Sequence, residues 1–537
     1  MAFGIVVALL VLGGIVIGAI AVVRRVMNKR DTGAGDGGDV LAYLVLVLAV
    51  GVAAFALASL AATAFPSEDF VIDVSGRVAN ALASLVVATP VAVFLWRRQE
   101  QRRATYPASS GWTVYLALIE AIFMTALVIA LFGLFEWIFG ESGGASWTNI
   151  VVFGGVVAFH EWAASRTPPA SDGADLPRVV GSAVGLIPAV IGLGGIIGWL
   201  FSEVYATLSP TAGGSDLGTW ASFLLAGAPI WYYRWLRPWP RERGGPRNAW
   251  TFLVSVAGLS SAIGSATFIA IQTLVFLLTD TEPAGVHFDF LPVTLTVAIV
   301  GAAVWVHHRR QLGTERTDPV RAYEYTMAAL GLMTTVGAAS ALSAAAFGPD
   351  DLVGARAEAV IAIAIALLVG ASVWLLFWMR ASNLPRETEA SSTPRRFYLI
   401  GLSVIVGLTS AGALIATLVI LFQRLLGSGD QESVVIPASL FIFAGLATWH
   451  LLRTNSEDRD LIGSEESVTP FTVTIICSHP GLVAAQFPSV AKVRVLYRGD
   501  EAGAIDEEMA AGIVEAVGHQ SSLVWVDADG FRVAPAR

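Results

Sequence analysis

The chain has 537 residues, of which 55% are hydrophobic and only 14% are charged, and its mean hydropathy is +0.68. An ordinary globular protein carries about 25% charged residues, so this composition excludes a purely soluble fold and indicates that lipid surrounds much of the chain. The net charge of −9 carries little information, because the charges lie in short loops and in the C-terminal tail. Cys477 is the single cysteine, which excludes an internal disulfide and a cysteine-based metal site.

The first apolar run, residues 2–23, contains no charged residue. It is long enough to cross a hydrocarbon layer of about 30 Å at ~1.5 Å per residue. Basic residues follow the run at 24–30, which is the reverse of a signal peptide, although Ala19-Ile-Ala21 resembles a cleavage site. We expect residues 1–30 to form an uncleaved anchor helix with the N-terminus outside, followed by a flexible linker at 31–39.

Twelve further apolar runs follow, and each approaches or exceeds the ~17–25 residues that a transmembrane helix needs. Since backbone groups in hydrocarbon must pair within their own segment, helix is the structure expected for runs of this length. The chain is therefore predicted to be an all-α polytopic membrane protein with about thirteen transmembrane helices. The predicted spans are 40–64, 78–96, 112–138, 148–164, 179–205, 219–235, 249–278, 290–307, 321–347, 359–379, 398–425 and 436–452.

Basic residues alternate between the turns in a way that predicts the topology. If the turn after the anchor lies inside, the inner turns hold 25 of the 33 basic residues and the outer turns hold only three. Such a bias is typical of cytoplasmic loops. We expect a bacterial inner (plasma) membrane location, with the C-terminus in the cytoplasm.

An internal repeat organises the spans, because the second helix of each pair ends in an aromatic and basic cluster. We name these the interfacial clusters, and their main members are Trp96, Arg97, Trp162, Trp231, Trp235, Trp305, Arg309, Trp374, Trp378, Trp449 and Arg453. Histidine occurs in every second cluster, at His160, His307 and His450. This longer period predicts three four-helix repeats, at 40–166, 177–312 and 318–455.

The helix starts Trp112-Thr-Val-Tyr-Leu, Arg321-Ala-Tyr-Glu-Tyr and Arg396-Phe-Tyr-Leu, each paired with a later aromatic helix end, resemble a known bacterial membrane family, DUF5671. The helix ends nearest to its Trp-x-x-His-Trp pattern are His160-Glu-Trp162 and Trp305-Val-His-His308. The family domain is a four-helix unit of unknown function, so the resemblance implies three tandem copies. It implies no catalytic or binding residue.

The interfacial clusters have two interpretations. Tryptophan and arginine commonly lie at the membrane–water interface, where the ring has one wet edge and the guanidinium reaches the headgroups. Alternatively, stacked Trp, His and Arg side chains would bind an anionic inner-leaflet headgroup or a cofactor.

Two other sets of residues are candidates for chemistry. Converging rings of His160, His307 and His450 would suit a metal ion or a haem, although His450 is one residue out of register and interfacial histidines are usually solvated. Glu120, about 12 Å from its helix start, is the best candidate for a transport path, because an ionisable residue at that depth tends to be functional.

The chain becomes polar after Thr454, which predicts an acidic linker at 456–469. Alternating and helical patterns then predict the order β, short helix, β, α, β, β in a small cytoplasmic α/β domain at 470–537. The loop that begins at Ser478 follows the first strand and could bind a ligand, but an ordinary turn is the commoner outcome. There is no phosphate-binding or metalloprotease motif.

These patterns favour a non-catalytic membrane scaffold, lipid-binding or sensing protein, without a cofactor and without nucleic acid as a partner. Its expected partners are the lipid bilayer, including anionic inner-leaflet lipids, and a cytosolic protein that meets the C-terminal domain. A transporter or channel with a path between the repeats is the alternative, and a membrane metal or haem protein is the third.

Overall fold

The computed structural model describes most of the chain from residue 36 onward, with gaps. The described residues are 36–64, 74–105, 110–140, 147–166, 175–206, 216–236, 245–279, 283–347, 356–426, 434–464, 471–477, 491–497, 507–517, 522–527 and 530–535. The predicted anchor helix at residues 1–30 lies outside them.

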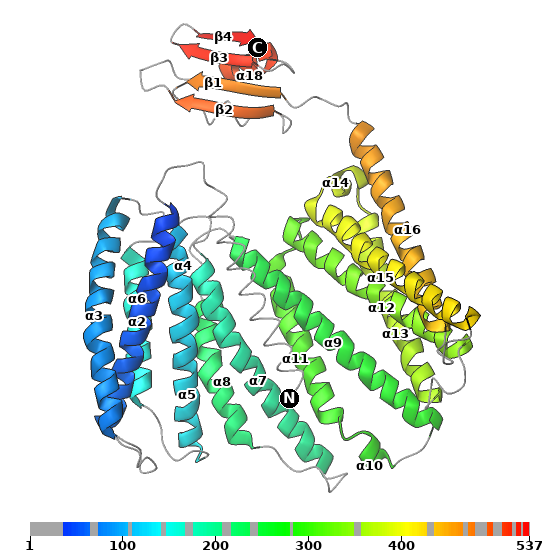
Figure 1. Cartoon of the computed structure of the whole chain (residues 1–537), viewed down its shortest axis with the longest axis horizontal. Coiled ribbons are helices and arrows are strands. Elements are labelled where there is room, and N and C mark those ends of the chain that lie inside the picture. Colours follow the sequence, from blue (N-terminus) through cyan, green and yellow to red (C-terminus); the bar gives the residue numbers. More distant parts are fainter. Residues whose placement is uncertain are drawn as a thin grey trace. The chain divides into compact units, whose positions relative to one another are not determined.

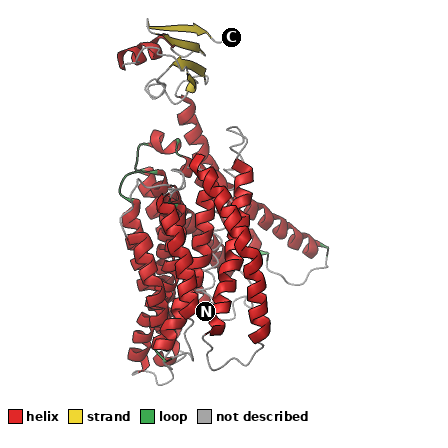
Figure 2. Cartoon of the chain, turned by 90° about the vertical axis from the view of Figure 1, so that its left-hand side faces the viewer, coloured by secondary structure: helices red, strands yellow, loops and turns green. Residues whose placement is uncertain are grey.

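Long helices dominate these residues (Figures 1 and 2). The long helical segments are α2 (Asp36–Ala64), α3 (Val74–Thr105), α4 (Ser110–Ile119) continued by η1 (Glu120–Met124) and α5 (Thr125–Ile138), α6 (Trp147–Arg166), α7 (Leu176–Ala206), α8 (Leu217–Trp231) continued by η3 (Tyr232–Leu236), α9 (Gly245–Thr279), α11 (Leu291–Leu312), α12 (Asp318–Phe347), α13 (Arg356–Ser382), α15 (Thr393–Leu425) and α16 (Val435–Ser464). Each predicted span after the anchor corresponds to one of them. Within the described residues, ten helices are long and apolar enough to cross a membrane, which confirms the all-α polytopic fold.

Several helices extend beyond their predicted ends. α16 continues to Ser464, past the start of the predicted linker at 456, and α2 begins at Asp36, within the predicted linker at 31–39. Ion pairs support the extension of α16, because Glu457 accepts hydrogen bonds from Arg453, one turn earlier, and from Arg386 of the short helix α14 (Arg386–Ala390). The bond to Glu457 raises the pKa of Arg386. The polar residues that follow residue 456 therefore do not end α16, which continues to Ser464.

Glycines bring the hairpin helices close together. A Cβ atom at Gly185 of α7 would lie 2.5 Å from the backbone nitrogen of Trp231 in α8, and one at Gly331 of α12 would lie 2.4 Å from that of Trp374 in α13. Such small residues let membrane helices pack backbone to backbone. The α7–α8 and α12–α13 hairpins thus share one mode of close contact.

In chain order, the long segments form three helix sets of four: α2, α3, α4–η1–α5 and α6; then α7, α8–η3, α9 and α11; then α12, α13, α15 and α16. These sets follow one another in a regular way. The segment α4–η1–α5 packs against both α7 and α8, and α9 packs against both α12 and α13. In each case the third helix of one set lies against the first hairpin of the next. The buried contact zones lie between these helices, whereas large apolar side chains such as Val86 (71% exposed) and Leu408 (70%) point outward.

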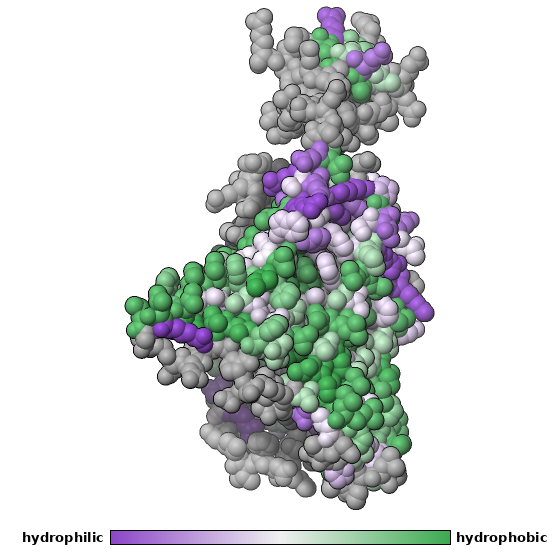
Figure 3. Space-filling model, turned by 90° about the vertical axis from the view of Figure 1, so that its right-hand side faces the viewer, coloured by the Kyte–Doolittle hydropathy of each residue, from purple (hydrophilic) through white to green (hydrophobic). Residues whose placement is uncertain are grey.

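The outward surface has the character expected of a membrane protein. In the space-filling view, hydrophobic residues cover most of the helix surface and hydrophilic residues gather toward one end (Figure 3). A protein surrounded by water rarely exposes contiguous apolar patches of more than a few hundred Å². Contact with lipid accounts for this surface.

A second compact unit comprises Pro385–Ser391 and the residues from Leu452 onward. Its sheet contains β1 (Phe471–Cys477), β2 (Ala491–Tyr497), β3 (Ser522–Asp527) and β4 (Gly530–Pro535), in the order β2-β1-β3-β4. β1 pairs in parallel with β2 and with β3, and β3 forms an antiparallel hairpin with β4. The helix α18 (Glu507–Val517) precedes β3. The strands and this helix agree with the predicted order; the predicted short helix between the first two strands, like the loop at Ser478, lies outside the described residues.

Candidate functional site

A buried ion network joins three helical segments that are far apart in the sequence. Arg234 of η3 donates from Nη2 to Glu120 Oε1 of η1 at 2.6 Å, and its Nη1 donates to Glu161 of α6. The side chains of Arg234 and Glu120 are only 3% and 6% exposed, whereas Glu161 is 38% exposed. Arginine therefore bridges a fully buried carboxyl group and one that reaches the surface of the bundle.

The backbone around this network is unusual. Glu120 opens the π-helical segment η1, and Arg234 lies inside the π-helical segment η3. π-Helical turns are rare and are found frequently at functional sites. Each turn contains one residue more than an α-helical turn would hold, and the two charged residues that meet in the bundle both come from such turns.

The network is tightly enclosed by α7. A Cβ atom at Gly181 would lie 2.9 Å from Glu120 Oε2 and 3.1 Å from Arg234 Nε. Both of these atoms are buried, and neither has a hydrogen-bond partner among the described residues. The carboxyl group of Glu161 is the second acceptor of the same guanidinium, through Arg234 Nη1. The site thus combines two carboxyl groups and one guanidinium in a closed space.

A second buried carboxyl group lies on α12. Glu324 is buried and pairs with Arg316, which precedes the helix, and with Arg380 of α13 at 3.4 Å. Neither partner of Glu324 is fully buried. This ion cluster ties the start of α12 to the end of α13.

The interfacial clusters form side-chain stacks inside the bundle rather than only a surface belt. Around α3, Arg103 lies over the rings of Trp112 and Trp96, at 4.0 and 4.6 Å from their centroids. His160 of α6 meets Trp96 edge-on at 5.7 Å, and its Nε2 is 2.7 Å from the hydroxyl of Tyr115. The stack links α3, α4 and α6.

Comparable stacks recur in the other two helix sets. His450 of α16 meets Trp378 of α13 at 5.7 Å, and Arg395 of α15 lies 5.4 Å from the same tryptophan ring. In the central set, His307 meets Trp231 at 5.4 Å and the adjacent His308 packs on the buried Trp235. A histidine from the fourth helix thus lies on a tryptophan from the second helix in each set.

The remaining members of the interfacial clusters differ in exposure. Trp162, Trp449, Arg97 and Arg453 are exposed, as an interfacial position requires. Trp305 is half-buried and donates to the hydroxyl of Tyr323, the ring that Arg309 covers at 5.5 Å. Trp374 is half-buried and meets His450.

The three histidines are held separately, each by its own stack. Both ring nitrogens of His160 are engaged, because Nδ1 is also 2.8 Å from the Val156 carbonyl. His307 shares its Nε2 with the Gln311 amide. Among the described residues, no three His, Cys, Asp or Glu side chains form a group that could hold a metal ion. The structure therefore does not bring His160, His307 and His450 together.

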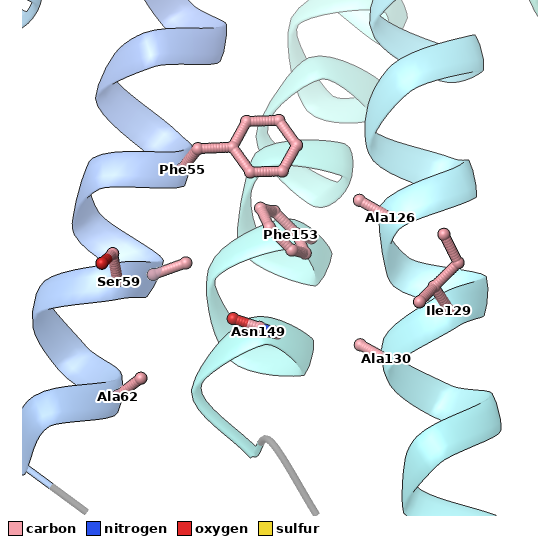
Figure 4. A pocket seen from close by; sticks show the side chains of 9 residues that line it. Phe55, Ser59, Ala62, Ala126, Ile129, Ala130, Asn149 and Phe153 are labelled. Atoms are coloured by element: carbon pink, nitrogen blue, oxygen red, sulfur yellow. The ribbon is translucent and has the colours of Figure 1, made fainter. Parts of the chain in front are cut away.

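An apolar pocket of about 390 Å³ lies between α2, α5 and α6 (Figure 4). Its lining residues are Phe55, Ala58, Ser59, Ala62, Ala126, Ile129, Ala130, Asn149 and Phe153. Ser59 and Asn149 supply the only polar side chains of this lining. Phe55 and Ile129 remain exposed, so the pocket opens to the surroundings of the bundle. Glu120 is not part of it.

Sequence patterns identified only part of this arrangement. Glu120 stands out by its depth in the span, whereas Arg234, Glu161 and Glu324 lie among the aromatic residues near helix ends and do not stand out. A buried carboxyl group requires a compensating partner, and this requirement alone indicates that a basic residue must reach Glu120. Nothing in the sequence indicates which of the neighbouring arginines does so.

Comparison with known proteins gives one match. Residues 39–158 and 321–446 each match the family model described as "Domain of unknown function (DUF5671)". No curated protein and no solved structure matches the chain. The two matched regions begin at α2 and at α12 and contain the corresponding helices of the first and third sets. Two regions of the chain, one in its N-terminal half and one in its C-terminal half, are therefore each similar to the DUF5671 domain.

Proposed function

We propose that this protein is a non-catalytic membrane scaffold that binds lipid, with the pocket between α2, α5 and α6 as the site of an acyl chain. The observation that carries the proposal is the apolar pocket of about 390 Å³, which is open to the outside of the bundle. Small-molecule sites are typically apolar and of comparable size, with a few polar groups that fix orientation. Ser59 and Asn149 are suited to that orienting role.

Shape must supply most of the affinity for such a ligand. A lipid tail loses little by leaving the bilayer, so hydrophobicity alone does not draw it into a protein pocket. Alanines at 58, 62, 126 and 130 create the space, and Phe55 and Phe153 form its aromatic wall. These two rings pack on each other, with centroids 5.0 Å apart. An acyl chain that lies against this wall gains van der Waals contact that mobile bilayer lipids do not offer.

Filling the pocket tests the proposal. Ala126→Trp is expected to reduce labelling by a phospholipid with a photoreactive acyl chain by roughly tenfold, equivalent to ~1.4 kcal/mol, because the indole occupies the space of the chain. Labelling is measured by mass spectrometry of the protein in proteoliposomes. Val151→Trp, on the exposed side of α6, is the matched control. Equal labelling of both variants at the wild-type level would contradict the proposal.

The proposed orientation places the N-terminus outside and the C-terminal domain in the cytoplasm of a bacterial cell, where this domain would meet a protein partner. Helix ends support it. The last turns of α3, α6, η3, α11 and α13 contain basic residues, whereas those of α2, α5, α7, α9 and α12 contain none. The former set runs toward the proposed inner side. α15 and α16 depart from this pattern.

Reporter fusions check this orientation. A fluorescent protein fused after Gly313 is expected to fluoresce in the cytoplasm, and alkaline phosphatase fused after Gly140 is expected to be active outside. The reverse pattern at both positions would overturn the topology.

We further propose that the central helices α7–α11 are a third, divergent copy of the family domain. The shared glycine contacts of α7–α8 and α12–α13 support this proposal. An experimental structure in which the central helices could not be superposed on α12–α16 would contradict it.

Transport along a path between the helix sets is the second candidate function. It is favoured by the ion network of Glu120, Arg234 and Glu161, which lies where α4–α6 meet α7 and η3. Transport requires water to reach Glu120 from both sides of the membrane. Lipid binding at the pocket does not require water to reach Glu120 from either side.

A further inference from the structure

The ion network of Glu120, Arg234 and Glu161 has an unbalanced charge if all three side chains are ionised. Two carboxylates and one guanidinium sum to −1, and the structure buries Glu120 and Arg234 almost completely. An uncompensated charge in such a place is strongly unfavourable. One added proton would make the network neutral.

The arrangement of the side chains also favours a proton on one of the two carboxyl groups. The carboxyl groups of Glu120 and Glu161 accept from the two terminal nitrogens of one guanidinium, which makes them close neighbours, yet an ionised carboxylate only accepts hydrogen bonds. Two such groups can share a bond only when one of them is protonated, as in the paired carboxyl groups of aspartic proteases. Glu120 Oε2, which lacks a donor among the described residues, fits this requirement. We propose that Glu120 and Glu161 form a carboxyl pair that binds a single proton, with Arg234 balancing the remaining negative charge.

A metal cation is a poorer occupant of this site. Hard cations need several oxygen ligands, six to eight for Ca²⁺ and an octahedron for Mg²⁺, and Arg234 already occupies Glu120 Oε1 and one oxygen of Glu161. The close approach of Gly181 limits the space beside Glu120 Oε2. The guanidinium adds repulsion toward any cation. A proton needs neither the ligands nor the space.

The surroundings give the proton one direct route of exchange. Among the described residues, the charged or titratable groups that contact the network are its own three side chains and Tyr233, whose ring centroid lies 5.5 Å from the Arg234 guanidinium carbon. Glu161 is 38% exposed, whereas Glu120 is almost completely buried. The proton therefore enters and leaves through Glu161. Whether the carboxyl pair holds this proton determines how strongly Arg234 is bound between α6 and η1.

Infrared spectroscopy tests the carboxyl pair directly. In the full-length protein in lipid nanodiscs at neutral pH, we expect one protonated-carboxyl stretching band that shifts in D₂O and is lost in both Glu120→Gln and Glu161→Gln. Each substitution leaves a neutral arginine–carboxylate pair, so both variants are expected to fold, which circular dichroism and gel filtration verify. Glu136→Gln, which removes a carboxyl group that accepts from Thr219, should retain the band.

Each possible outcome either supports or contradicts the carboxyl pair. Loss of the band in both variants, with its retention in Glu136→Gln, supports the shared proton. Absence of the band from the wild-type protein, or its persistence in either variant, would overturn the carboxyl pair. The result does not depend on lipid binding, because the pocket and the ion network share no residue.

Discussion

Replacement of Arg234 by methionine is expected to destabilise the folded protein by ~3–5 kcal/mol, because a buried ion pair that loses one partner leaves an uncompensated charge. The residue matters because its guanidinium contacts Glu120 and Glu161 simultaneously and ties α6 and η1 to η3. Equilibrium unfolding in mixed micelles measures the loss. A shape-compatible apolar residue keeps the packing of the arginine stem and isolates the electrostatic effect.

Two further variants make this test specific. Arg310→Met removes an arginine that is exposed at the end of α11, and we expect it to change the stability by less than ~1 kcal/mol. The double variant Arg234→Met with Glu120→Gln removes the buried carboxylate as well and should recover much of the lost stability. If Arg234→Met unfolds at the same detergent fraction as Arg310→Met, the ion network has no role in stability.

Gly192→Ala is expected to cost ~1–3 kcal/mol through overpacking, even though alanine favours helix more than glycine does. A Cβ atom at this position of α7 would lie 2.2 Å from the backbone nitrogen of Leu224 and 2.6 Å from the carbonyl oxygen of Trp220. Both atoms belong to the backbone of α8, so no side-chain rotation relieves the contact. The two helices must move apart along the hairpin.

Gly264→Ala is the matched control for this substitution. Gly264 lies within α9, and a Cβ atom there meets nothing within 4 Å. The same change is therefore expected to stabilise the protein by up to ~1 kcal/mol, the difference in helix propensity between the two residues. Unfolding of both variants under one set of conditions gives the comparison. A stabilising Gly192→Ala would mean that α7 and α8 are not in backbone contact.

The helices were predictable because hydrocarbon leaves the backbone few alternatives. A long apolar run must satisfy its own hydrogen bonds, so each span can be located without knowledge of its neighbours. The strands Phe471–Cys477 and Ser522–Asp527 were predictable for a related reason, since alternation and turn residues are local properties. Helix ends were less predictable, as α16 shows, because Arg386 stabilises its last turns from elsewhere in the sequence.

The candidate site was only partly predictable because pairing is a property of the packed bundle. Glu120 stands out from its apolar neighbours by position alone. Arg234 does not, because an arginine near a helix end beside two tryptophans is also typical of a membrane interface. Its burial depends on Gly181, which admits the guanidinium beside α7. That contact joins residues 53 positions apart, and no local pattern encodes it.

The two π-helical turns have a consequence for tolerance of insertions and deletions. Each accommodates a surplus residue, so a one-residue deletion within Glu120–Met124 can be absorbed by conversion to an ordinary α-helical turn. Within α5, which follows η1, a one-residue deletion would instead rotate every later side chain of the helix by about 100° around the helix axis. Lipid-facing and bundle-facing positions would then be exchanged. The chain can therefore vary in length at the places where its buried charges meet, while the rest of the span keeps its orientation.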